Sequence, residues 1–374
     1  MDILEKSRFT ELARRTEEIK SKRVLAGFDG FIDAILKPLL RSGDGHSSGT
    51  YFKTLAEFGT YIGEHSNTSA SIEMDLIERR MGGNMPNFAG AIAALGVDLS
   101  CIGMLSDHNG EVDPVFLDLP GEVYSFAPAG TAMALEFNDG KLFLAPRYTL
   151  EESPWPLIEN ACRFPKPRGE LQRQAPRTGV SPEELLRGAD LIACLNWGEL
   201  SFMDGLWRGL FDRCASLFSR DKKKLVFFDL ADFSRRTPAE IQGVLTLIER
   251  FSSLRTTILS LNRNEALLLG EHALKTKAAK NAGIAQSVSQ TYAIDEVLIH
   301  SHEDALVYTG RKAYAAETIR CPSPKISTGA GDHFNAAYAF AALMGLCFED
   351  RLQFANQYAY TYVSTGIRPN LKSL

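Results

Sequence analysis

The chain reads Ser327-Thr328-Gly329-Ala330-Gly331-Asp332-His333-Phe334-Asn335 near its C-terminus, and an apolar, alanine-rich run from Ala336 to Phe348 follows at once. Small residues let a backbone come close to a ligand. The first N–H groups of a helix lack intrahelical acceptors and carry the positive end of its dipole. The stretch therefore predicts a glycine loop that leads into a helix and binds an anion such as phosphate.

Asp332 is the unexpected member of this loop, because a carboxylate repels a phosphate beside it. An acid in the first turn commonly stabilises a helix, and for the loop taken alone this interpretation is favoured. The alternative is a base that takes the proton from a hydroxyl as the hydroxyl attacks phosphorus. Both interpretations stay open on the loop alone.

Composition limits the class of protein and its partners. The chain has 374 residues, of which 45% are hydrophobic, which suits a globular protein of two domains or of one large α/β domain with an appendage. A net charge of -5 without a long basic run argues against nucleic acid or an anionic membrane surface as partner. Residues 1–22 are charged and helical in period, so we expect an N-terminal helical extension rather than a signal peptide.

The six cysteines are scattered and form no Cys-x-x-Cys pair. Cys101, Cys194 and Cys347 lie in apolar runs, which predicts buried thiols. We expect a reducing, cytoplasmic location.

Short apolar segments alternate with helix-period stretches for most of the chain. Strands that are apolar on both faces and separated by helices predict a mostly parallel sheet covered by helices on both sides. Ligands of such sheets bind beyond the carboxyl ends of the strands. The expected strands are Arg23–Gly27, Leu99–Met104, Leu191–Leu195, Lys224–Asp229, Thr257–Leu261, Val297–His300 and Ala305–Tyr308, and the expected helices include Asn87–Leu95, Ser201–Phe218, Pro238–Phe251 and Asn264–Leu269.

Three stretches depart from this alternation. Residues Thr68–Met81 read as a strand, and Thr131–Leu144 as a hairpin that turns at Asp139-Gly140. They predict either surface hairpins or a small β lid over the sheet. Residues Glu151–Thr178, rich in Pro, Arg and Gln, predict an irregular excursion.

A second glycine motif lies upstream, where residues 82–96 read Gly-Gly-Asn-Met-Pro-Asn-Phe-Ala-Gly-Ala-Ile-Ala-Ala-Leu-Gly. A Gly-Gly turn enters a helix of small residues that ends at a glycine. Tight helix–sheet packing accounts for the small residues, and Asn84 could be an N-cap. Packing alone gives no reason for Gly82, Gly83 and Asn87 to occur together.

The two glycine motifs, in this order, resemble the signatures of the ribokinase-like (PfkB) carbohydrate kinases. The resemblance implies a three-layer α/β fold over residues 23–374, with a mostly parallel central sheet and a small β lid from about 68–81 and 131–144. It implies that Asp332 is the base and that the amides of Gly329, Ala330 and Gly331 hold the transferring phosphoryl group. Neighbouring helix amides should keep Asp332 ionised.

The resemblance also implies a sugar site. Gly82 and Gly83 would admit the sugar, and Asn87 would bind a hydroxyl. Asp33 matches an Asp that holds substrate hydroxyls after the first strand, and a carboxylate suits polyols because it accepts from two hydroxyls. Asp29 is an additional acid at this edge, which either binds substrate or caps a helix.

Nucleotide and metal residues follow in the same way. Asn262 and Glu265 match an Asn-x-x-Glu element that organises the hydrated Mg²⁺ of the nucleotide, although the pair also reads as a capping box. Thr328 of the loop and Asn356 match positions near the nucleotide, and Asn356 could instead face solvent on a packed helix.

Three features depart from the family pattern. Ile326 stands where the family usually has an Asp that orders a monovalent-cation site, so activation by potassium stays open. The nucleotide turn of the family appears here as residues 300–305, in which side chains replace both glycines and His300 and His302 could donate to a phosphate. The chain is also longer, mainly in 42–67 and 151–178.

The sequence therefore predicts a kinase that uses Mg²⁺ and a nucleotide to phosphorylate a primary hydroxyl of a sugar or related polyol, with ATP as the expected donor and ADP as the alternative. Few basic residues surround Asp33 and Gly82, which favours a substrate without phosphate. The alternative is a non-catalytic sugar- or nucleoside-binding protein on the same fold. Exposed lid edges could pair two subunits into a homodimer.

Overall fold

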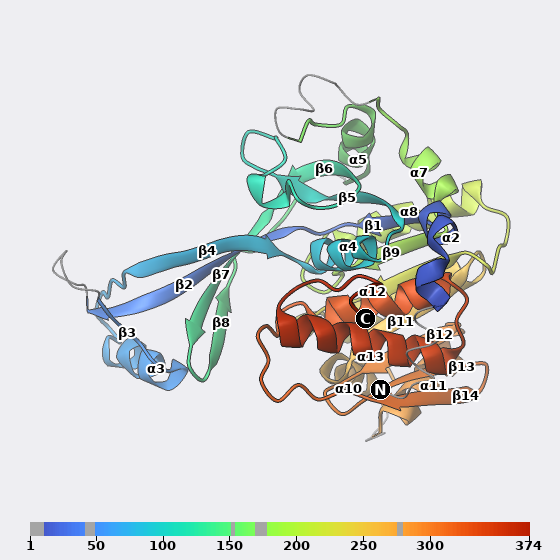
Figure 1. The fold of residues 1–374 in the computed structure, drawn as a ribbon. Coiled ribbons are helices and arrows are strands. Elements are labelled where there is room, and N and C mark those ends of the chain that lie inside the picture. The colour runs from blue at the N-terminus through green and yellow to red at the C-terminus, as the bar shows by residue number, and fades with distance from the viewer. Residues whose placement is uncertain (1–10, 42–48, 151–153, 169–177, 275–279) are drawn as a thin grey trace.

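The computed structural model describes residues 11–41, 49–150, 154–168, 178–274 and 280–374 (Figure 1). A nine-stranded sheet forms its centre, with the strand order β14-β13-β12-β11-β10-β9-β1-β5-β6. The strands from β12 to β6 pair in parallel, and β13 and β14 are added antiparallel at one edge. Their bounds are β1 Arg23–Gly27, β5 Asp98–Ser106, β6 Glu122–Pro128, β9 Leu191–Leu195, β10 Leu225–Asp229, β11 Thr256–Asn262, β12 Glu296–His300, β13 Asp304–Thr309 and β14 Lys312–Glu317.

Helices cover both faces of this sheet. The central strands are apolar throughout because both of their faces are buried. In β1, Leu25 belongs to the core on one face of the sheet, and Val24 and Ala26 belong to the core on the other. On the first face lie α5 Pro154–Arg163, α7 Pro182–Gly188, α8 Met203–Leu217, α9 Pro238–Ser252, α10 Arg263–His272 and α11 Asn281–Tyr292. On the other lie α4 Asn84–Ala94, α12 Ala330–Leu343 and α13 Phe348–Thr365. The predicted three-layer α/β fold is confirmed.

A smaller five-stranded sheet projects from one end of the body (Figure 1). Its order is β3-β2-β7-β8, with β4 on the other edge of β2, and α3 Leu55–Glu64 packs on it. The bounds are β2 Phe31–Arg41, β3 Thr50–Tyr51, β4 Met74–Gly82, β7 Gly130–Phe137 and β8 Gly140–Leu144. The predicted hairpin is present as β7 and β8, but its turn lies one residue earlier, at Asn138-Asp139, because Gly140 already pairs with Phe137. The strand expected from Thr68 begins only at Met74.

Two expectations are corrected by the structure, and a third can be compared with it only in part. The predicted irregular excursion contains α5, whose Trp155 and Ile158 are buried. Cys347 is exposed, because it stands outside α13 at its N-cap, whereas Cys101 and Cys194 are buried as expected. In the N-terminal segment, 11–14 and α2 Thr16–Ser21 are helical. Parts of the expected extension (1–10), of the first insertion (42–48) and of the excursion (151–153 and 169–177) lie outside the described residues.

All six cysteines are free thiols. Within the ranges that the structure describes, no helix has both the length and the apolar character needed to cross a bilayer.

Candidate active site

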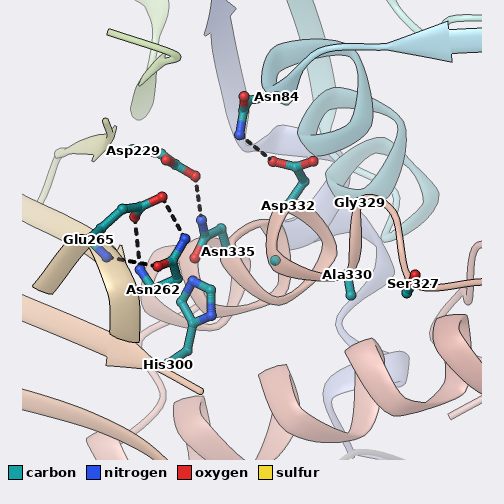
Figure 2. Close-up of a pocket in the computed structure, with 11 residues that line it drawn as sticks. Asn84, Asp229, Asn262, Glu265, His300, Ser327, Gly329, Ala330, Asp332 and Asn335 are labelled. Carbon is teal, nitrogen blue, oxygen red and sulfur yellow. Dashed lines mark hydrogen bonds between the residues drawn. The ribbon is translucent and has the colours of Figure 1, made fainter. Parts of the chain in front are cut away.

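The candidate site is a cavity of about 170 Å³ at the carboxyl ends of three parallel strands, β10, β11 and β12, facing the start of α12 (Figure 2). The position agrees with the general rule for parallel sheets. Among the residues that the structure describes, eleven line the cavity, and none of these is Lys or Arg: Asn84, Asp229, Asn262, Glu265, His300, Ser327, Gly329, Ala330, Gly331, Asp332 and Asn335.

The glycine loop has the geometry expected of an anion site, with one exception. Gly329 is the N-cap of α12 and has φ 80°, a left-handed conformation that favours glycine. No described side chain caps the helix, so the N–H groups of its first turn remain available to a ligand. The exception is Ala330, whose N–H donates to the carbonyl of Ser327 at 3.2 Å. Of the three amides expected to hold phosphate, that of Ala330 already has an intrachain acceptor.

Asp332 lies in the first turn of α12, but its carboxylate does not cap that helix. Its Oδ1 accepts a hydrogen bond from Asn84 Nδ2 at 2.9 Å (Figure 2). The contact joins the two glycine motifs, which are far apart in the sequence.

The environment of Asp332 favours its charged form less than the adjacent helix start predicts. Burial raises its pKa well above the ordinary value, and the charges of Asp229 and Asp29 raise it further. Hydrogen bonds from Asn84 and Asn87 lower it, but they rank below these causes. The helix start can be read from the local sequence, whereas Asp229 comes from the end of β10 and Asp29 from the loop after β1.

Asp29 caps α4 from the loop after β1. Its two carboxylate oxygens accept from the N–H groups of Asn84 and Met85, each at 2.8 Å, and Asn196 Nδ2 donates at 3.0 Å. Asp29 is fully buried, and burial raises its pKa to about 6. The N-cap position itself is Gly83, so Asn84 is not the N-cap, and the capping alternative for Asp29 is confirmed.

The Gly-Gly pair makes room for two carboxylates. A Cβ on Gly82 would lie 2.3 Å from Asp33 Oδ1, and one on Gly83 would lie 2.6 Å from Asp29 Oδ2. Gly83 also has φ 89° and ψ 155°, which only glycine adopts readily. The pair therefore fixes where both acids lie.

Asp33 lies on β2 at the base of the smaller sheet and is 7% exposed. Burial raises its pKa, and the charge of Arg80 lowers it. Arg80 stands directly opposite Asp33 in the β2–β4 register, so the expectation of few basic neighbours misses this guanidinium. Arg80 Nη2 is buried and has no hydrogen-bond partner among the residues described. Asp33 and Arg80 thus offer an acceptor and a donor side by side.

Asn262 and Glu265 form the capping box at the start of α10. Glu265 N donates to Asn262 Oδ1 and Asn262 N to Glu265 Oε2, each at 2.9 Å, and Asn262 Nδ2 donates to Glu265 Oε1 at 2.6 Å (Figure 2). Burial raises the pKa of Glu265 well above its ordinary value, and Asp229 raises it further. The capping interpretation is confirmed, and both residues also line the cavity, where the predicted metal role remains untested.

Of the residues expected near the nucleotide, some line the cavity and others lie outside it. His300 lines the cavity, and burial lowers its pKa to about 4, so its imidazole is neutral. His302 is exposed and does not line the cavity. Asn356 is 4% exposed and donates to the carbonyl of Glu317 at 3.0 Å, so it does not face solvent. Thr328 lies in the glycine loop, where its carbonyl accepts from Tyr362.

Four residues that line the cavity were not predicted as site residues: Asn84, Asp229, Ser327 and Asn335. Asn335 Nδ2 donates to Asp229 Oδ2 at 2.7 Å, and Ser260 donates to Asn335 Oδ1 at 2.7 Å. Burial raises the pKa of Asp229 to about 6. The available signals were the position of Asp229 at the end of its strand and of Asn335 one helical turn after Asp332.

Residues 8–374 match the family model described as prokaryotic ketohexokinase. The chain belongs to this family. A curated ketohexokinase from Haloferax volcanii is 26% identical over 372 residues, which cover 96% of this chain and 91% of that one. The predicted resemblance to PfkB carbohydrate kinases is thereby confirmed.

Solved structures agree on the fold. A ribokinase from Thermotoga maritima covers 94% of this chain and 95% of its own with a TM-score of 0.57 at 15% identity. An adenosine kinase from Sinorhizobium meliloti covers 93% and 94% with a TM-score of 0.60, also at 15% identity. At such identities these similarities show the ribokinase fold alone. Membership of the ketohexokinase family makes this chain a sugar kinase, a phosphotransferase with an alcohol group as acceptor, and the non-catalytic alternative is not favoured.

Proposed function

We propose that the protein transfers the terminal phosphoryl group of ATP to a primary hydroxyl of a ketohexose. The observation that carries this proposal is the hydrogen bond between Asn84 and Asp332, which brings the sugar motif and the phosphate loop to one point. The name of the Haloferax volcanii relative supports the sugar class, and a solved Arabidopsis thaliana ribokinase complexed with ribose and ATP supports the donor.

The acids at the base of the smaller sheet would hold the sugar. Asp33 accepts hydrogen bonds from hydroxyls, and the buried Nη2 of Arg80 donates to an oxygen of the same sugar. The side chain of Asn87 is anchored to the carbonyl of Gly83 at 3.0 Å and keeps its oxygen for a substrate hydroxyl. One guanidinium beside a carboxylate suits a neutral polyol better than a sugar phosphate, which needs several cations.

Asp332 would take the proton. As the substrate oxygen forms its bond to phosphorus and the bond to the leaving ADP breaks, the hydroxyl proton passes to the Asp332 carboxylate. A pKa above that of an ordinary aspartate makes Asp332 a stronger base, provided it is ionised when substrate arrives. The amides of Gly329 and Gly331 face the charge that builds on the phosphoryl oxygens.

The donors in the cavity fit Mg²⁺. Asp229, Glu265 and Asn262 supply only oxygen ligands of the kind Mg²⁺ prefers, and Mg²⁺ keeps several waters, so few ligands suffice. The charge of Asp229 raises the pKa of Glu265, and no Lys or Arg among the described residues lines the cavity to offset the two acids. When bound, Mg²⁺ would supply positive charge to the nucleotide phosphates beside these residues.

Magnesium should stabilise the protein more at high pH than at low pH. A buried Asp whose pKa is higher in the folded than in the unfolded protein stabilises the fold at any pH below its unfolded-state pKa. This stabilisation is lost as the pH rises through the folded-state pKa, which is about 6 for Asp229. Without metal, the melting temperature should therefore fall as pH rises through this window. With MgCl₂ the fall should be smaller, because a cation relieves the repulsion between ionised carboxylates.

Scanning fluorimetry at about pH 5 and about pH 8, with EDTA or MgCl₂, measures this effect. Asp229→Asn should reduce the Mg²⁺-dependent shift at the higher pH. An equal Mg²⁺ shift at both pH values, or no change in Asp229→Asn, would contradict metal binding at these residues.

The substrate proposal is tested by measuring ADP formation from Mg-ATP with ketohexoses, aldoses, ribose and adenosine. We expect the highest kcat/KM for a ketohexose, and Arg80→Leu should raise the sugar KM with little change in kcat. A nucleoside as best substrate, or no turnover with any sugar, would overturn the proposal.

Two further parts of the expected function remain proposals. A homodimer through the smaller sheet is supported by its exposed apolar side chains, among them Leu76 at 56% and Phe143 at 49% exposure. A cytoplasmic location is supported by the six free thiols, since such thiols persist in a reducing compartment.

A further inference from the structure

The loop before α12 contains a tight turn whose direction decides what faces the cavity. Ala330 N donates to Ser327 O at 3.2 Å, which closes a four-residue turn over residues 327–330. Gly329, the third residue, has φ 80° and ψ 3°, the values of a type II turn.

Type I and type II turns differ mainly in a rotation of about 180° of the central peptide. Here that peptide joins the carbonyl of Thr328 to the N–H of Gly329. The two groups point in opposite directions because the peptide is planar and trans. In the observed turn the carbonyl points to Tyr362, outside the residues that line the cavity, and the N–H points the other way. A flipped peptide would present a carbonyl oxygen to phosphate and would repel it.

Tyr362 on α13 holds the observed orientation. Its hydroxyl donates to Thr328 O at 3.1 Å, and the side chain is 7% exposed. The next carbonyl, that of Gly329, lies 2.8 Å from Nδ1 of His333, which is fully buried. Each of the two consecutive peptides is therefore fixed by a side chain on the side away from the cavity.

The two side chains also fix each other. The rings of His333 and Tyr362 stack with centroids 3.5 Å apart and planes at 10°. Since Gly329 O can only accept, Nδ1 of His333 carries the proton and Nε2 is an acceptor, one without a partner among the described residues. Burial lowers the pKa of His333 to about 4, so the imidazole keeps this neutral form across the working pH range.

We infer that Tyr362 is a positioning residue for phosphoryl transfer: with His333 stacked on it, its hydroxyl holds the Thr328–Gly329 peptide so that an N–H, and not a carbonyl, faces the transferred group. The inference rests on the proposed function for its kinetic consequence. It assigns no contact between Tyr362 and substrate. The sugar site lies on β2 and α4, so loss of the hydroxyl should act on the chemical step and not on sugar binding.

Tyr362→Phe tests the inference, because it keeps the ring stack and removes only the hydroxyl. The matched control is Tyr358→Phe on the same helix. The hydroxyl of Tyr358 is buried and lies 2.8 Å from both Ala91 O and Pro369 O, which share its one proton, and it does not contact the loop. Tyr362→Phe should lower kcat about 10- to 100-fold at an unchanged sugar KM, somewhat less than the loss of an entire oxyanion donor. Tyr358→Phe should lower the melting temperature but should not change kcat at temperatures well below that transition.

Equal kcat values for the two variants would overturn the inference. A crystal structure of Tyr362→Phe provides a readout that does not depend on activity. We expect the Thr328 carbonyl turned toward the cavity in all or part of the molecules, whereas a turn identical to that of the parent chain would overturn the inference. Failure of the sugar-kinase proposal would instead show as absence of turnover in the parent chain, with the variant's turn still flipped.

Discussion

Replacing Asp332 with Asn should lower kcat by at least about 10³-fold and change the affinity for sugar by no more than a few-fold. The amide cannot take the hydroxyl proton. Its oxygen can still accept the hydrogen bond that Asn84 donates to the aspartate at 2.9 Å, so the local geometry is retained. Coupled measurement of ADP formation gives kcat, and calorimetric titration with the sugar gives its affinity.

Asp350→Asn is the matched control for this variant. Asp350, like Asp332, is an aspartate in the first turn of a helix, but it lies on α13 and does not line the cavity. If first-turn charge were all that Asp332 contributes, the two variants would lose similar small amounts of stability and keep their rates. Near-normal turnover in Asp332→Asn would therefore refute its role as base.

The pH dependence of the parent chain adds a check on the same residue. Because the pKa of Asp332 is raised, its ionised fraction still increases with pH above the range in which an ordinary aspartate is fully ionised. The rate should rise with pH over that range and then level off.

Replacing Gly83 with Ala should destabilise the protein by about 4 kcal/mol and remove most activity. The backbone at φ 89° and ψ 155° strains any side chain, at roughly 1–3 kcal/mol. The new Cβ would also lie 2.6 Å from Asp29 Oδ2, a carboxylate that is fully buried and caps α4. If Asp29 shifts, the N–H groups of Asn84 and Met85 lose their acceptor, and Asn84 no longer meets Asp332.

Urea denaturation measures this loss, and Gly59→Ala is the control. Gly59 lies within α3, and a Cβ there would meet nothing within 4 Å. Alanine is the better helix former by about 1 kcal/mol, so this variant should be slightly more stable than the parent chain. A loss below about 1 kcal/mol in Gly83→Ala would show that the Asp29 cap tolerates displacement.

Local sequence predicted the parts of the fold that local interactions determine. The bounds of β1 and β9 agree with their strands residue for residue, because buried parallel strands are continuous apolar runs between polar ends. β2 was missed, since Lys37 and Pro38 interrupt the apolar pattern of a strand whose outer half mixes buried and exposed residues. The glycine loop and its helix were found from nine residues.

Interactions between distant segments account for what the sequence did not reveal about the site. Asp29 caps a helix 55 residues further along the chain, so neither neighbourhood shows the partner. The raised pKa of Asp332 comes from its burial and from two carboxylates far away in the sequence, while the adjacent helix start alone argues for the opposite shift. Arg80 becomes a neighbour of Asp33 only through the β2–β4 register.

The position of α13 has a consequence for synthesis on the ribosome. Its Tyr362 holds the glycine loop, and its Tyr358 joins the carbonyls of Ala91 on α4 and Pro369 beyond the helix. A nascent chain therefore contains Asp332 and both glycine motifs well before it can arrange them. Activity therefore requires that α13 has left the exit tunnel and packed beside the glycine loop and α4.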